Sequence, residues 1–402
     1  MQFDHTVIDR HAKTQPFDAA FWTPVKQQLL WIILVSCVGI SPSLAPAYEV
    51  NEKVTLGAAG RTFVQYGHSS NTFDMNGKEL DDKPRGVLIG DLTADFHPTD
   101  SDEFYTWFRF VKGNGLNRFE PAVLTPYGGD VRDDVKDINE TNRSYLLEAW
   151  YKRTFGMGDT SALAATAGII DSAAYIDDNA YANDPDAQFM HEIFSNSNLP
   201  GFPSYAVGTA LEFDTENWSL RSVYMNLKNE EDRTYNYFAG QAGYRLETAL
   251  GEGNYRLFVF TTNDRFQDSS SNPDEKALSG YGVSTDQQWG AALGIFFRAA
   301  IQQDVAVVNF DRQFSSGANV NGRLWGRPTD ECGLGYAYLN GGSGSDFDNS
   351  HVVEAYIKYQ LSKHADLRFD VQYKKRSLKY DGGRVNPYLC VLGTRLNANF
   401  KT

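Results

Sequence analysis

Long apolar runs are almost absent from this chain of 402 residues, whose mean hydropathy is −0.44. A helix that spans a bilayer needs about 20 consecutive apolar residues, so a bundle of transmembrane helices is excluded. Positive charge is also scarce: the chain has 37 Lys and Arg residues and 51 Asp and Glu residues, which give a net charge of −14. This balance disfavours nucleic acid as a partner.

The one clear apolar run, residues 29–40, follows Lys26 and precedes the small-residue triplet 45–47. A basic start, a short apolar stretch and small residues predict a signal peptide cleaved after Ala47, with a non-cleaved anchor helix as the alternative. Residues 1–24 lack signal character, and we interpret them as a misassigned extension with Val25 as the encoded initiator.

Cysteine and catalytic motifs are scarce as well. Of three cysteines, Cys332 and Cys390 follow residue 47. They form either a disulfide of an exported chain or, as we prefer, two small apolar residues on outward strand faces. The sequence contains no G-x-S-x-G or H-E-x-x-H motif. Ser350 and His351 are adjacent and would face opposite sides of a strand, so we expect no enzyme activity and no cofactor or metal.

What the sequence does have is alternation with a period of two. In residues 353–361 the odd positions are Val, Ala, Ile, Tyr and Leu, whereas the even positions include Glu354 and Lys358. Residues 366–373 and 388–400 repeat this division. A face that carries charges cannot pack into an apolar core. A membrane barrel, with lipid outside and water inside, gives each face of the strand a suitable solvent.

Sixteen segments carry this strand pattern. They cover residues 54–66, 86–97, 103–112, 144–155, 162–171, 205–213, 217–226, 237–247, 253–263, 288–298, 303–311, 316–326, 331–339, 351–361, 365–374 and 387–400. Each is close to the 9–11 residues or so that a tilted transmembrane strand needs, and short connections alternate with long ones. We therefore predict an all-β fold: a single 16-stranded antiparallel β-barrel of residues 48–402 in the outer membrane of a Gram-negative bacterium. A soluble β-sandwich is the alternative.

The inward positions supply candidate pore-lining residues. These are Asp91, Asp95, Trp107, Arg109, Glu148, Trp150, Lys152, Arg221, Arg245, Arg298, Arg323, Glu354, Lys358, Arg368 and Asp370. Guanidinium and carboxylate groups can bridge neighbouring sugar hydroxyls, and flat aromatic faces accept pyranose C–H groups. The alternative is that these groups only line a wet lumen and pair with one another across it.

Several stretches resemble one known family. Residues 168–171, 179–184, 188–189 and 199–203, then 322–328 and 333–338, and the closing hairpin with 393–396, are similar to the carbohydrate-selective porins of the OprB type. The resemblance implies a 16-stranded channel for passive entry of glucose-like sugars, narrowed by an inward loop. The sequence departs from the family pattern at Ile169, where a basic residue is common in the family. It also departs at Lys401 and Thr402, which follow the terminal aromatic Phe400.

The resemblance also sets the expected partners: mono- and small oligosaccharides, outer-membrane lipid and the barrel assembly machinery, as a monomer or a homotrimer. We expect residues 171–203 to form the constriction loop. Four of its acids either bind Ca²⁺ or form a solvated acidic surface; they are Asp177, Asp178, Asp184 and Asp186. A general or cation-preferring porin is the alternative function.

Overall fold

The computed structural model describes residues 48–71, 82–117, 124–128, 135, 145–199, 202–229, 231–270, 274–379 and 386–400. The chain divides into two units, Met1–Ser43 and Leu44–Thr402, and the described residues all belong to the second. The signal segment expected at residues 1–47 lies outside the described residues. In the described ranges no helix combines the length and the apolar character that crossing a membrane requires.

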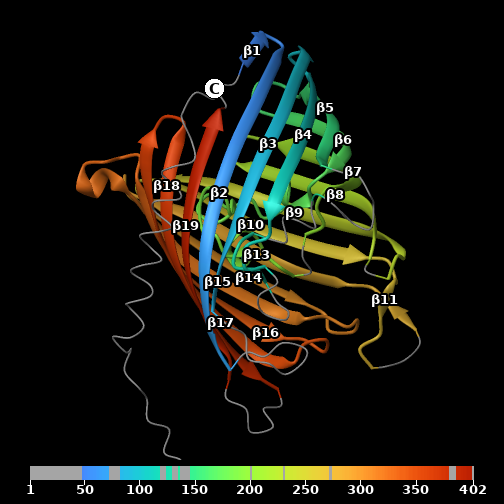
Figure 1. The fold of residues 1–402 in the computed structure, drawn as a ribbon. Coiled ribbons are helices and arrows are strands. Elements are labelled where there is room, and N and C mark those ends of the chain that lie inside the picture. Colours follow the sequence, from blue (N-terminus) through green and yellow to red (C-terminus); the bar gives the residue numbers. More distant parts are fainter. Residues whose placement is uncertain are drawn as a thin grey trace, which may run out of the picture. The chain divides into compact units, whose positions relative to one another are not determined.

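Sixteen long antiparallel strands of the described chain form one sheet that closes on itself (Figure 1). They are β2 (Val54–Ser70), β3 (Lys83–Thr99), β4 (Asp102–Gly113), β5 (Leu146–Gly156), β6 (Ala162–Ile170), β7 (Ala206–Asp214), β8 (Trp218–Lys228), β9 (Thr234–Thr248), β10 (Gly251–Thr262), β13 (Ser279–Trp289), β14 (Leu293–Gln302), β15 (Phe310–Asn321), β16 (Glu331–Gly341), β17 (Phe347–Ser362), β18 (Ala365–Leu378) and β19 (Tyr388–Phe400). The shorter elements are β1 (Tyr48–Asn51), β11 (Phe266–Gln267), β12 (Glu275–Lys276) and the 3₁₀ helices η1 (Ser172–Ala174), η2 (Glu192–Phe194) and η3 (Gly322–Trp325). The predicted 16-stranded barrel is confirmed.

The closing seam joins the first and last long strands. β19 pairs with β2 from Tyr388 opposite Ser70 to Phe400 opposite Ala58, and the two ribbons lie side by side in Figure 1. This pairing leaves neither strand with a free edge of backbone N–H and C=O groups. A sheet inside lipid needs such closure, because hydrocarbon cannot hydrogen-bond an open edge.

The faces of the strands divide as the sequence pattern predicts. On β18, Val371 is 53% exposed on the outside, whereas its neighbours Asp370 and Gln372 are buried within the barrel. Leu88 and Leu257 are likewise exposed on the outer face. A soluble sandwich would bury the apolar face and expose the polar one, so this arrangement favours lipid as the outer solvent.

The strand boundaries predicted between residues 288 and 326 are wrong. The alternation predicts segments at 288–298, 303–311 and 316–326, whereas the structure has β13 at Ser279–Trp289, β14 at Leu293–Gln302 and β15 at Phe310–Asn321. β13 was overlooked because Gly280, Gly282 and polar residues weaken its alternation, which leaves Tyr281 and Trp289 as its main outward markers. As a consequence Arg323 lies in η3, beyond the end of β15, and is exposed rather than inward on a strand.

The described parts of the connection between β6 and β7, residues 171–199 and 202–205, fold into the barrel; we call them the inward loop. Two apolar clusters hold it. Ile176, Leu199 and Phe202 pack with residues of β8–β10, including Met225, Tyr237 and Phe258. Phe189, Ile193 and Phe194 pack with Phe296, Ala337 and Tyr356 of β14, β16 and β17. Full burial of one such side chain contributes roughly 1.5–3 kcal/mol, so the loop is firmly attached to this part of the wall.

Glycines on the inner face of β16 let the loop approach closely. A Cβ placed on Gly335 would lie 2.9 Å from Cε1 of Phe194 and 3.0 Å from Cε1 of Phe189. Neighbouring Gly333 meets Phe189 and Tyr356 in the same way. The absence of side chains at these positions therefore makes room for the aromatic rings of the loop.

We expect Gly335→Val to displace the inward loop. Overpacking of this kind costs about 1–3 kcal/mol, so the loop should lose part of its packing and the single-channel conductance should become larger and noisier. Leu334→Val on the outward face of the same strand, where Leu334 is 59% exposed, is the matched control. Identical conductance traces for both variants would contradict the close packing of loop against wall.

Candidate pore constriction

A cavity of about 870 Å³ lies between the inward loop and strands β2–β5. The wall contributes Arg61, Asp91, Trp107, Arg109 and Glu148. The loop contributes acids and amides, among them Asp171, Asn183, Asp184, Asp186, Glu192 and Asn198. Four of the predicted candidates, Asp91, Trp107, Arg109 and Glu148, thus meet at one site.

Two arginines join the wall to the loop across this cavity. Arg109 of β4 donates from Nε and Nη2 to Asp91 of β3, at 2.8 and 3.1 Å, and Arg61 of β2 also bonds Asp91. On the loop side, Asp186 Oδ2 lies 3.2 Å from Arg61 Nε and 3.5 Å from Arg109 Nη2. Two guanidinium groups are therefore held between two carboxylates, one on the wall and one on the inward loop.

Asp186 stays ionised despite its burial. Burial alone raises the pKa of its carboxyl, but Arg61, Arg109 and the donated hydroxyl of Tyr127 outweigh burial and hold that pKa below its usual range. Tyr127 belongs to the β4–β5 connection and stacks on Phe63 of β2, with ring centroids 4.1 Å apart. A second connection thus supports the ion cluster from the side.

Aromatic rings border the charged groups. The guanidinium carbon of Arg109 lies 4.6 Å from the centroid of Trp107, and Trp107 meets Tyr205 edge to face at 6.0 Å. Tyr105 stacks on Trp150 at 5.0 Å, and Trp150 Nε1 donates to Glu148 at 2.8 Å. The predicted candidate Trp150 therefore positions two cavity-lining side chains.

Three further candidates anchor the inward loop. Glu354 accepts from the backbone N–H groups of Met190 and His191 at 2.5 and 2.8 Å. Arg298 donates to Asp177 Oδ1 at 2.8 Å and to the carbonyl of Phe194 at 3.0 Å. Arg368 donates to the carbonyl of Gln188 at 3.3 Å. These side chains were predicted to line the pore; the structure places them beneath the loop instead.

The remaining candidates are dispersed. Arg221 and Arg245 line a separate cavity of about 260 Å³ near the β7–β8 and β9–β10 turns. The ammonium of Lys152 pairs with the carboxylate of Glu212 at 2.7 Å, and Asp95 pairs with His97 at 3.0 Å. The buried carboxylate of Asp370 accepts a hydrogen bond from the side chain of Gln372 at 3.1 Å. Lys358 is half-buried on β17, opposite Arg368 in register.

Arg61 and Asp186 were absent from the predicted site residues. Arg61 is the only Lys, Arg, Asp or Glu residue of β2, and it lies at an inward position among small residues. The alternation of the strand is therefore sufficient to predict it as a pore-lining residue. Asp186 sits in the loop, where no periodicity indicates a direction. Arg395 of β19 was also missed; its Nη2 donates to the carbonyl of Gln188 at 3.3 Å.

Two of these four loop acids, Asp177 and Asp186, are enclosed by arginines of the wall, whereas Asp178 and Asp184 are exposed. Asp177 is fully buried against Arg298, Asp178 lies 2.8 Å from Arg256 Nε, and Asp186 is enclosed by Arg61 and Arg109. The solvated interpretation is wrong for Asp177 and Asp186, because the arginines of the wall neutralise them. Within the described ranges the one group of three possible metal ligands lies elsewhere, at Asp95, His97 and Glu103. Cys332 and Cys390 are both free.

The chain has recognisable relatives. Residues 103–400 match the family described as "Carbohydrate-selective porin, OprB family". An "Uncharacterized protein" of Aquifex aeolicus (strain VF5) is 31% identical over 292 residues, which are 72% of this chain and 80% of that protein. The fold resembles the high pH structure of Pseudomonas putida OprB, with a TM-score of 0.67 at 15% identity over 87% of this chain and 94% of that one. It also resembles the outer membrane channel DcaP of Acinetobacter baumannii, with a TM-score of 0.52 at 12% identity over 89% of this chain and all (100%) of that one. The chain therefore belongs to the carbohydrate-selective porin family of the OprB type.

Proposed function

We propose that this outer-membrane porin conducts glucose-like sugars passively through the cavity between the inward loop and strands β2–β5. The family consists of channels and not of enzymes. The observation that carries the proposal is the lining itself, in which Arg61, Arg109 and Asp91 stand beside Trp107. Charged planar groups bridge vicinal hydroxyls, and an indole accepts the C–H face of a sugar ring.

Conduction requires weak binding, because a substrate that is held tightly does not leave. A dissociation constant near 1 mM corresponds to about −4 kcal/mol and suits this purpose. Planar-bilayer recordings with a panel of mono- and disaccharides test the proposal. We expect glucose to block ion current at millimolar concentration and to enter liposomes in swelling assays. Failure of every sugar to block current or to swell liposomes would exclude a sugar channel.

A cation-preferring diffusion porin is the second candidate, and one observation favours it. The residues that line the cavity include six carboxylates but only two guanidinium groups. The carboxylates belong to Asp91, Glu148, Asp171, Asp184, Asp186 and Glu192, and the guanidinium groups to Arg61 and Arg109. A reversal potential measured across a KCl gradient reports this preference. Cation selectivity without any block by sugar would support the second candidate over the first.

Asp171 is expected to make the ion selectivity depend on pH. Its carboxylate accepts from Ala173 N–H at 3.0 Å and from Ser204 Oγ at 3.1 Å, and burial raises its pKa to about 6. The group is therefore mostly charged at pH values above about 6 and neutral below, so acidification removes one negative charge from the cavity. Cation preference should fall between about pH 7 and pH 5.

The comparison that isolates this group is Asp171→Asn, which keeps an oxygen acceptor without the charge. Its reversal potential at pH 7 should approach the wild-type value at low pH. Desolvation raises the pKa of Asp184, which lines the same cavity, so some pH dependence should remain in the variant. A variant that titrates like the wild type would show that Asp171 does not set the selectivity.

Export by a signal peptide cleaved after Ala47 belongs to the same proposal, together with insertion by the barrel assembly machinery into outer-membrane lipid. Amino-terminal sequencing of the protein extracted from outer membranes tests the cleavage point, and a first residue of Tyr48 is the expected result. The native mass of the detergent-extracted protein distinguishes the monomer from the homotrimer.

A further inference from the structure

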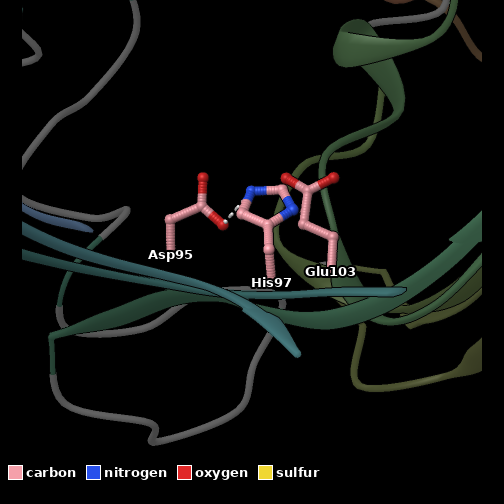
Figure 2. Close-up of side chains that lie close together, drawn as sticks. All are labelled: Asp95, His97 and Glu103. Carbon is pink, nitrogen blue, oxygen red and sulfur yellow. Dashed lines mark ion pairs between the residues drawn. The ribbon is translucent and has the colours of Figure 1, made fainter. Parts of the chain in front are cut away.

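Three potential metal ligands gather at the end of the β3–β4 hairpin. Figure 2 shows the imidazole of His97 between the carboxylates of Asp95 and Glu103. Asp95 and His97 lie near the end of β3, and Glu103 lies near the start of β4, on either side of the short turn at residues 100–101. No step of the proposed sugar passage uses this group of side chains.

The position of the cluster relative to the constriction follows from the strand register. Asp91 lies opposite Arg109, Thr93 opposite Trp107, and Asp95 opposite Tyr105. Thr93 and Tyr105 line the cavity. The cluster therefore lies on the same inner face, one step beyond the cavity toward the short turns. Short turns are periplasmic in outer-membrane barrels, so this is the periplasmic mouth of the channel.

The distances suit a single bound ion. His97 Nε2 lies 3.0 Å from Asp95 Oδ1, and one ligand atom from each of the three residues lies within 4.8 Å of the others. Zn²⁺ binds nitrogen and oxygen at about 2.0–2.2 Å, which puts ligand atoms of a tetrahedral site about 3.4 Å apart. Side-chain rotations of the exposed His97 and of the half-buried Asp95 and Glu103 would be needed to bring all three atoms to that spacing.

The electrostatics also favour a cation. Asp95 Oδ1 is buried and accepts no hydrogen bond among the described residues, although the imidazole is adjacent. Lys152 lies opposite Glu103 in register, but its ammonium pairs with Glu212 at 2.7 Å. The side chain of His97 is 47% exposed, so the cluster is open to water in the lumen. The exposed imidazole thus lies between two half-buried carboxylates, where water and an ion in the lumen can approach it.

We propose that Asp95, His97 and Glu103 bind Zn²⁺ or a similar first-row divalent cation at the periplasmic mouth, with water completing the coordination. One imidazole nitrogen and two carboxylate oxygens match the ligand preference of these ions, whereas Ca²⁺ and Mg²⁺ take oxygen ligands. A bound ion neutralises two carboxylates of the lumen and opposes the passage of cations. This inference does not depend on the channel's sugar selectivity.

Zinc titration of the full-length protein, purified without a histidine tag, tests the inference. Calorimetry should give one site for Zn²⁺ per chain, and Ca²⁺ should bind far more weakly. In a planar bilayer, Zn²⁺ added on the short-turn side should lower the cation current, and a chelator should restore the current. His97→Ala and the double variant Asp95→Asn/Glu103→Gln should each lose roughly tenfold or more in Zn²⁺ affinity.

His364→Ala is the matched control. His364 is half-buried at another short turn, between β17 and β18, where its Nδ1 lies 3.2 Å from the carbonyl oxygen of Asn399. This variant should bind Zn²⁺ like the wild type. Equal loss in His97→Ala and His364→Ala, unchanged affinity in His97→Ala, or equal binding of Ca²⁺ and Zn²⁺ would overturn the proposal. Heat-modifiable mobility on gels confirms that each variant forms the folded barrel.

Discussion

Arg109→Ala should abolish most of the block of ion current by glucose. Arg109 joins Asp91 of the wall to Asp186 of the inward loop, so its removal leaves two buried carboxylates with Arg61 as their shared cation. Breaking a buried ion pair from one side costs about 3–5 kcal/mol. We therefore expect the loop near Asp186 to move away from the wall, with a wider pore and at least a roughly tenfold weaker block.

The control for this prediction is Arg312→Ala. Arg312 is 64% exposed and its contact with Asp311 is long, at 3.8 Å, so losing it should leave both conductance and block unchanged. Single-channel conductance and the glucose concentration for half block are measured on both variants. If glucose blocks the ion current of Arg109→Ala as strongly as that of the wild type, Arg109 does not take part in sugar binding.

The architecture could be predicted because lipid imposes a simple rule on sequence. Each inserted strand must present apolar side chains outward, and polar residues can occupy only the alternate positions, as β17 and β18 illustrate. The rule loses its force where a strand is poor in large apolar residues. β13 is such a strand, and because the pattern misses it, all three segments predicted at 288–298, 303–311 and 316–326 are out of place, although the total of sixteen is correct.

The site could be predicted only in part, for a related reason. Alternation fixes the face on which a side chain lies, which suffices for Asp91, Trp107 and Arg109. It does not give the path of a long loop inside the barrel. Glu354 and Arg298 were therefore assigned to the open pore, whereas the loop covers both. The glycines at 333 and 335 belong to a stretch that resembles the family, but the sequence does not indicate that they contact Phe189 and Phe194.

Arg298→Met is expected to release the inward loop and to destabilise the barrel. Arg298 is 1% exposed and donates to the carboxylate and carbonyl of Asp177 and to the carbonyls of Phe194 and Ser195. Met fills much of the volume but leaves Asp177 buried without its cation, which costs about 3–5 kcal/mol. The variant should unfold at a lower denaturant concentration and show frequent transitions between conductance levels.

The double variant Arg298→Met/Asp177→Asn separates charge from packing. If the unpaired carboxylate is the main cost, the neutral amide should recover much of the lost stability, because the side chain introduced at position 177 carries no charge that burial penalises. The hydrogen bonds to Phe194 and Ser195 are lost in both variants, so the conductance transitions should persist in the double variant. Recovery of steady conductance together with stability would mean that Asp177, and not the anchoring of the backbone, determines where the loop lies.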